Sequence, residues 1–203
     1  MPLNSFLLQL VPKKLMHQSS ILGELLHADA AKFGWVSADA NSGGAEGPVA
    51  PAVTHSWTTM VSEVQRYIKS LNFQYRVSLR DANVKYINGL GEFTGPNSVK
   101  VTEYKGKAKT PKEKTLTSAR FLIATGGRPT PISCPGAEFA ITSDDIFSLE
   151  TNPGKTCFVG AGYVSLECAG FLTALGCDTT ILVRSILLRG FDRECCDKIE
   201  AYM

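Results

Sequence analysis

A short glycine turn, Gly160-Ala161-Gly162, is the stretch of this sequence best suited to binding a ligand. It follows the apolar run CFV and precedes YVSLECAGFLTALG, whose apolar spacing is helical. Backbone without bulky side chains can approach a pyrophosphate closely, and the start of the helix offers unpaired N–H groups and a positive dipole end. Ser165 replaces the third glycine of the pattern, but it is small enough for the helix to lie close to the strand. The turn therefore predicts a dinucleotide site.

Basic residues follow the next apolar run, in VRSILLR. A carboxylate at this place would bind the ribose 2′-hydroxyl of NAD, whereas Arg184, Ser185 and Arg189 stand where a 2′-phosphate would lie. Arginine binds such a dianion through bidentate, charge-assisted hydrogen bonds. The pattern favours NADPH over NADH; the alternative is two arginines on a solvated loop.

The elements that position these residues form a βαβ unit, in which CFVG and DTTILV are strands around the helix. The continuous apolar run FLIATGG, residues 121–127, predicts a strand buried on both faces, as in a parallel sheet. Four segments with period two are expected to be strands of a β-meander. They are YRVSLR (75–80), NVKYI (83–87), SVKVTEY (98–104) and TLTSARFLIAT (115–125).

Two amphipathic helices are expected in the first part of the chain. Pro12 suits the first position of a helix, and Gly34 is a plausible stop. Between the two helices, residues 37–53 read as a surface loop, and the charged residues 105–114 read as the tip of a hairpin. The apolar face of the first helix is Leu15, Leu22, Leu25, Leu26 and Phe33. That of the second is Trp57, Met60, Val61, Val64, Tyr67, Ile68 and Leu71.

The composition excludes several classes of protein. The chain has 203 residues, 44% of them hydrophobic, and its formal charge is only +2, which argues against nucleic acid or a membrane surface as the main partner. No apolar window approaches the roughly 18 residues of a membrane span, and the leading run is short for a signal peptide. Six cysteines without a CxxC pair or clustered histidines give no metal site, and the adjacent Cys195 and Cys196 are not expected to form a disulfide. We expect an intracellular chain.

Several motifs occur together and in order: ATGGRP, ITSDDIFSL, VGAGYVSLECAGFL and VRSILLRGFD. They resemble the disulfide-reductase flavoenzymes of the class I pyridine nucleotide-disulfide oxidoreductase family. With VPKKLMHQ and SLNFQYRVSLRD, the sequence looks most like the large, animal-type thioredoxin reductases, including thioredoxin-glutathione reductases. The resemblance runs from Val11 to Met203, apart from the loop at 37–53.

The resemblance implies an α/β fold: a partial, two-domain Rossmann-like flavoprotein that binds FAD and NAD(P), with a β-meander. Residues 1–150 would be part of an FAD-binding domain, and residues 151–203 the first part of an NADPH-binding domain. Such enzymes pass electrons from NADPH to FAD, then to a cysteine pair and on to thioredoxin, in cell redox homeostasis. The implied state is a homodimer in the full-length family, in the cytoplasm or in mitochondria.

The resemblance also assigns site residues. Tyr163 would be an aromatic lid that moves when nicotinamide stacks on the flavin, and Lys13 would pair with Glu167 beside both rings. Gly91 would contact the FAD adenine, and Thr125 and Gly126 would lie at a strand end close to FAD. The residues that would hold NADPH are Ala161, Gly162, Val164 and Glu167, with Arg184, Ser185 and Arg189 at the 2′-phosphate.

The sequence departs from the family at its start. Ser5 and Leu10 stand where the family has its redox-active Cys-x-x-x-x-Cys pair, and neither can form a thiolate, so no catalytic residue is assigned. The opening FAD strand, the rest of the NADPH domain and the dimer domain are also expected to be missing. We therefore expect a fragment, whose first ten residues could come from outside the true exon. The alternatives are a catalytically inactive truncated paralogue that binds nucleotide or a partner subunit, and a stand-alone NADPH-binding dehydrogenase.

Overall fold

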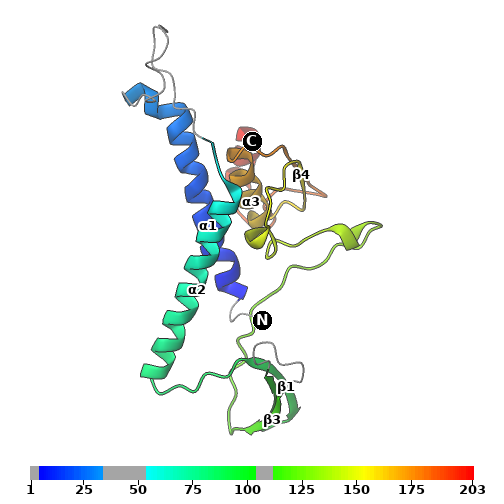
Figure 1. Cartoon of the computed structure of the whole chain (residues 1–203). Helices are drawn as coiled ribbons and strands as arrows, with labels where there is room; N and C mark the ends of the chain where they lie inside the picture. Colours follow the sequence, from blue (N-terminus) through cyan, green and yellow to red (C-terminus); the bar gives the residue numbers. More distant parts are fainter. Residues whose placement is uncertain (1–4, 34–53, 104–111) are drawn as a thin grey trace. The chain divides into compact units, whose positions relative to one another are not determined.

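The computed structural model in Figure 1 describes residues 5–33, 54–103 and 112–203. They form two compact units: residues 67–128 with the start of the first helix, and residues 9–66 with 129–203. The predicted loop at 37–53 and most of the predicted hairpin tip at 105–114 lie outside the described residues. The two units do not test the expected domain boundary near residue 150, which stays a prediction.

The first helix, α1, spans Ser5–Glu24 and continues as a π-helical turn, Leu25–Asp29, and a 3-10 turn, Ala30–Phe33. The prediction that Pro12 opens the helix is wrong, because Pro12 lies inside it. Proline lacks an N–H and removes one hydrogen bond from the helix interior. Its ring is fully buried, so burial of apolar surface offsets part of that loss.

The predicted apolar face of α1 is also wrong over its second half. Phe33 is 81% exposed, and Leu22, Leu25 and Leu26 are exposed as well. Beyond Glu24 the chain changes from α to π and then to 3-10 geometry, so the α-helical spacing of the predicted face does not continue there. Among residues 10–24 of α1, the buried side chains are Pro12, Lys13, Met16 and Ser20.

The second helix, α2, spans Trp57–Asp81, and its predicted face is mostly confirmed. Five predicted positions are buried, whereas Tyr67 is exposed and Leu71 is half-buried. A stripe with this spacing is the pattern of an amphipathic helix packed on one side. The buried residues are Trp57, Met60, Val61, Val64 and Ile68.

The same helix contradicts the predicted strand at residues 75–80, which form its last turns. Extending a helix that has already formed costs far less than starting a new element, and alternation over six residues is a weak signal against it. The chain turns away after Asp81 at Asn83, whose φ is 56°, with Val84 N–H donating to the Leu79 carbonyl over 2.8 Å. This left-handed C-cap suits asparagine.

The second unit has its core where α2 meets the chain segment before β4 (Thr156–Val159). The Trp57 indole N–H donates to the Leu149 carbonyl (2.9 Å), and the Gln65 amide donates to the Phe147 carbonyl (2.8 Å). The Phe147 ring lies 6.5 Å from the Phe171 ring, and both are almost fully buried. Two 3-10 helices, η4 and η5, span Ala137–Phe139 and Ile146–Ser148.

The first unit contains a three-stranded antiparallel sheet in the order β1-β2-β3. The strands are β1 (Gly89–Gly95), β2 (Ser98–Glu103) and β3 (Lys112–Thr117), which form an antiparallel meander. The sequence predicts a meander, but only β2 matches a predicted strand over its length: β3 overlaps the start of the strand predicted at 115–125, and β1 is not among the predicted strands. The Phe93 and Phe121 rings meet edge to face, with centroids 5.1 Å apart.

Two other predicted strands are wrong. Residues 83–87 and 121–125 have extended or irregular backbone, and no described segment pairs with either one. A strand exists through its ladder of hydrogen bonds, and none of the described strands pairs with the apolar run at 121–125. Leu122 and Ile123 are accordingly 93% and 70% exposed.

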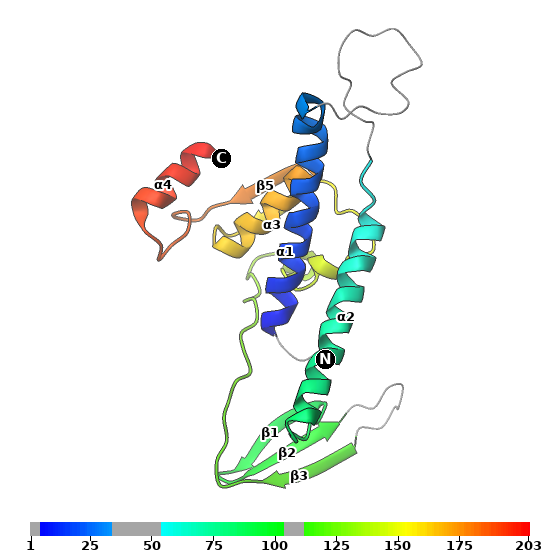
Figure 2. The same ribbon diagram turned by 90° about the vertical axis from the view of Figure 1, so that its left-hand side faces the viewer.

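The βαβ unit is confirmed. Strands β4 (Thr156–Val159) and β5 (Thr179–Leu182) are parallel, with α3 (Tyr163–Ala174) between them in the chain and α4 (Arg193–Tyr202) after them. Figure 2 shows α1 beside α3. Within the described parts of the chain, no helix has the length and apolar content needed to cross a membrane.

Candidate dinucleotide site

The glycine turn joins the end of β4 to the start of α3. Gly160 has φ 113°, a conformation that disfavours any residue with a side chain, and its N–H donates to the Leu182 carbonyl of β5 over 3.0 Å. Gly162 is the N-cap of α3 and leaves the helix start without a side-chain cap or an acidic residue in the first turn. A Cβ built at Gly160 or Gly162 meets nothing within 4 Å, so the space before the turn is open. The turn fits a pyrophosphate.

Two of the residues predicted to hold the nucleotide, and Ser165, lie around this turn. Ala161 and Val164 are half-buried, and the small Ser165 lies in the first turn of α3. The Ser165 hydroxyl is buried and has no hydrogen-bond partner among the described residues. The small side chain of Ser165 lets the start of α3 lie close to the strand before it.

The predicted 2′-phosphate residues lie on the loop that follows β5. Arg184, Ser185 and Arg189 are all exposed, and Arg189 Nη2 donates to Ser185 Oγ over 2.6 Å. The structure thus brings a guanidinium and a hydroxyl together at the edge where the glycine turn lies. Both groups can donate to phosphate oxygens.

The loop is joined to the glycine turn at Leu188. Its N–H donates to the Ala161 carbonyl over 2.8 Å, although Leu188 has the left-handed φ of 48°. Leu187, Leu188 and Cys196 form a buried cluster with Ala161 and Leu166. The hydrogen bond fixes the distance between the two halves of the candidate site.

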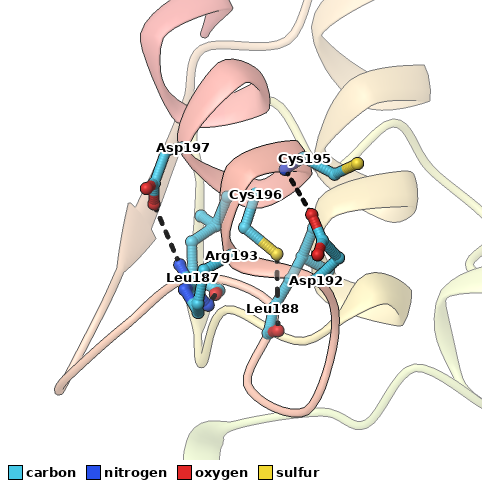
Figure 3. A network of polar contacts seen from close by, with 7 residues as sticks. All are labelled: Leu187, Leu188, Asp192, Arg193, Cys195, Cys196 and Asp197. Carbon is cyan, nitrogen blue, oxygen red and sulfur yellow. Dashed lines mark hydrogen bonds and ion pairs between the residues drawn. The ribbon is translucent and has the colours of Figure 1, made fainter.

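Side chains of α4, which follows the loop, contact the loop backbone, as Figure 3 shows. Arg193 Nη1 donates to the Leu187 carbonyl (2.8 Å), and Cys196 Sγ donates to the Leu188 carbonyl (3.7 Å). Asp192 caps α4 by accepting from the Cys195 N–H (3.0 Å). Neither the left-handed Leu188 nor the role of Arg193 could be read from sequence, but an aspartate before a helical pattern does signal an N-cap.

Lys13 and Glu167 form the ion pair expected from the resemblance, linking α1 to α3. The Lys13 side chain is only 9% exposed, whereas that of Glu167 is 51% exposed. Lys13 Nζ also lies 5.1 Å from the centre of the Tyr163 ring, within the range of a cation–π contact. Tyr163, itself half-exposed, meets the Phe191 ring edge to face at 6.3 Å.

Cys168 lies next to this ion pair and is 1% exposed. Burial raises the pKa of its thiol to about 12, against the opposing effect of the Lys13 charge. Cys168 is therefore a neutral core residue and not a nucleophile.

The residues predicted to contact FAD belong to the first compact unit, whereas Lys13 and the glycine turn belong to the second. Gly91 lies on β1 opposite Val101. The strand end expected at Thr125 and Gly126 is not formed, and Gly126 has φ 69°. These residues do not by themselves make a cradle for a flavin.

Ser5 and Leu10 both lie on α1, and Leu10 is 48% exposed. All six cysteines of the chain are free, including the adjacent Cys195 and Cys196, as predicted. Of the six, Cys134, Cys157 and Cys195 are exposed.

A comparison with protein families identifies the family of this chain. The model of the pyridine nucleotide-disulphide oxidoreductase family matches residues 4–203. The chain belongs to this family. FAD and NADPH are the cofactors that the family uses, and its members are oxidoreductases.

Individual relatives are similar over nearly the whole chain. A thioredoxin reductase of Plasmodium falciparum is 47% identical over 195 residues, which cover 95% of this chain and 33% of the relative. A thioredoxin reductase of Emiliania huxleyi is 46% identical over 194 residues, covering 95% of this chain and 35% of the relative. The chain thus spans about a third of the length of these relatives.

Proposed function

We propose that this chain is the part of an NADPH- and FAD-dependent thioredoxin-disulfide reductase that holds the start of the NADPH site. The observation that carries the proposal is the hydrogen bond between Leu188 N–H and the Ala161 carbonyl. It joins an open glycine turn to a loop that carries Arg184, Ser185 and Arg189. A dinucleotide with a 2′-phosphate needs both features at one edge of a parallel sheet.

Each half of the site recognises one part of the nucleotide. The backbone at Ala161 and Gly162 and the start of α3, with Val164, would bind the pyrophosphate. The guanidiniums of Arg184 and Arg189, with the Ser185 hydroxyl, would bind the 2′-phosphate. NADPH is preferred over NADH because two arginines on one loop gain more from a 2′-phosphate dianion than from a neutral 2′-hydroxyl.

At the nicotinamide end, Tyr163 would cover the pocket and move aside for the ring. When bound, NADPH supplies a hydride for FAD. The buried ammonium of Lys13, balanced by Glu167, would stabilise negative charge that develops nearby in a site of low dielectric. Gly91, Thr125 and Gly126 would contact FAD within the longer protein.

Reduction of a substrate disulfide needs a thiol, and Ser5 and Leu10, which stand at the family's two cysteine positions, have none. This observation favours a second candidate function: a catalytically inactive paralogue that binds nucleotide or a partner subunit. Thioredoxin as substrate, homodimer formation and a cytoplasmic or mitochondrial compartment belong to the first proposal.

Calorimetric titration of the purified chain with NADPH and with NADH tests the nucleotide site. We expect NADPH to bind more tightly, and Arg184→Gln with Arg189→Gln to remove the difference. The matched control is Arg66→Gln, which removes an exposed charge on α2. Equal binding of the two nucleotides by the unchanged chain would overturn the proposed NADPH site.

Two further measurements separate the candidate functions. A chain that purifies with a flavin absorbance band and reduces thioredoxin with NADPH is a reductase. A colourless chain that binds NADPH without turnover is the inactive nucleotide-binding protein. Restoring cysteines with Ser5→Cys and Leu10→Cys gives activity only if flavin is bound.

A further inference from the structure

Arg193 is the first residue of α4, and its side chain is hydrogen-bonded to the loop between β5 and α4. Its Nη1 donates to the Leu187 carbonyl over 2.8 Å, and its Nη2 lies 3.3 Å from Asp197 Oδ1 (Figure 3). One guanidinium thus ties the backbone of the loop to the helix that follows. The loop is also held by the contacts of Leu188 with Ala161 and Cys196.

The loop needs such an anchor because Leu188 adopts a conformation that leucine disfavours. A left-handed φ on a residue with a branched side chain persists only where its surroundings hold it. Leu187 and Leu188 are 5% and 7% exposed, so the strained segment is also the buried segment. Arg189 follows directly, and the direction of its side chain depends on the backbone at Leu188.

We infer that Arg193 is a positioning residue that sets the preference of this chain for a 2′-phosphate over a 2′-hydroxyl. It acts through the Leu187 carbonyl, which keeps the loop in the conformation that brings Arg189 to Ser185. The inference rests on the proposed NADPH site and adds a residue to it. Arg193 differs from Arg189 because its guanidinium is held by a backbone carbonyl and a carboxylate, whereas that of Arg189 donates to the Ser185 hydroxyl.

Positioning must be separated from two further ways in which Arg193 could affect binding. Arg193 could act as a distant positive charge, an effect that salt screens. It could also act by stabilising α4 through Asp197, in which case Asp197→Asn would have the same consequence. Positioning predicts instead that Arg193→Lys, which keeps the charge but has a single ammonium in place of the forked guanidinium, has an intermediate effect.

The test uses two probes that differ only at the 2′ position, 2′,5′-ADP and 5′-AMP. Calorimetric titration gives the ratio of their dissociation constants for the unchanged chain and for Arg193→Gln, Arg193→Lys and Asp197→Asn. We expect Arg193→Gln to lower the preference for 2′,5′-ADP about tenfold, the scale of one charge-assisted hydrogen bond, with 5′-AMP unaffected. Asp197→Asn should retain the preference for 2′,5′-ADP. The loss of this preference in Arg193→Gln should persist at about 0.5 M salt, where interactions between distant charges are screened. Circular dichroism establishes that each variant is folded.

The outcomes are distinct. If Arg193→Gln and Asp197→Asn behave alike, or if the loss disappears at high salt, the positioning role is wrong while the proposed NADPH site stands. If Arg193→Gln does not fold, Arg193→Lys decides: an unchanged preference overturns the inference. If the unchanged chain shows no preference for 2′,5′-ADP, the proposed function itself fails, and the inference fails with it.

Discussion

Lys13 and Glu167 pair across two helices with very different exposure, the lysine buried and the glutamate half in water. The buried ammonium depends on its partner, because an unpaired charge away from water is costly. The glutamate depends on the lysine much less, because water solvates its carboxylate. The two ends of this ion pair therefore contribute unequally to stability.

Glu167→Gln should destabilise the chain more than Lys13→Met. Removing the carboxylate leaves a buried ammonium unpaired, at a cost of about 1–3 kcal/mol, less than in a fully buried pair because Glu167 is half exposed. Methionine in place of Lys13 keeps the buried volume and costs within about 1 kcal/mol. Urea unfolding followed by circular dichroism measures both. A larger loss for Lys13→Met would contradict the assigned asymmetry.

The buried thiol of Cys168 makes stability depend on pH at alkaline values. Burial raises its pKa from 9.0 to about 12, so the folded state favours the protonated thiol. This contribution is complete below pH 9 and is lost as the pH rises from 9 towards 12. Between pH 9 and 12, the free energy of unfolding of Cys168→Ala, measured by urea unfolding at each pH, should fall less than that of the unchanged chain. Identical pH profiles for the two would show that the thiol plays no part.

Much of the βαβ unit could be predicted from sequence because its signals are local. The change from a short apolar run to a helical spacing, with glycines between, marks β4, α3 and the turn. The run at 121–125 misled because continuous apolar residues predict burial only when other strands cover them, and here Leu122 is exposed. The contacts around Leu188 could not be predicted. Neither a left-handed leucine nor the hydrogen bond from Arg193 to the Leu187 carbonyl produces a periodic pattern in the sequence.

The cap of α4 should respond to acid. Hydrogen bonds from the Cys195 N–H and thiol hold the pKa of the Asp192 carboxyl below its usual value of 3.8. A lowered pKa gives stability that is present above pH 3.8 and lost as the pH falls below it. Asp192→Ala should lower the melting temperature at neutral pH, whereas Asp192→Asn should keep the cap without this pH dependence. Equal melting temperatures for the alanine and asparagine variants would show that the cap is not needed.

Gly162→Ala separates nucleotide binding from folding at the glycine turn. Gly162 has an ordinary φ of −79°, and a Cβ there meets no atom within 4 Å, so alanine changes the stability of the free chain by about 1 kcal/mol at most. The same methyl group occupies the space through which a pyrophosphate would approach the backbone. We expect NADPH to bind about tenfold more weakly, a loss of roughly 1.4 kcal/mol, at an unchanged melting temperature. Gly170→Ala is the matched control, because a Cβ at this position on α3 also meets nothing within 4 Å. If Gly162→Ala binds NADPH as tightly as the control, the pyrophosphate does not lie at this turn.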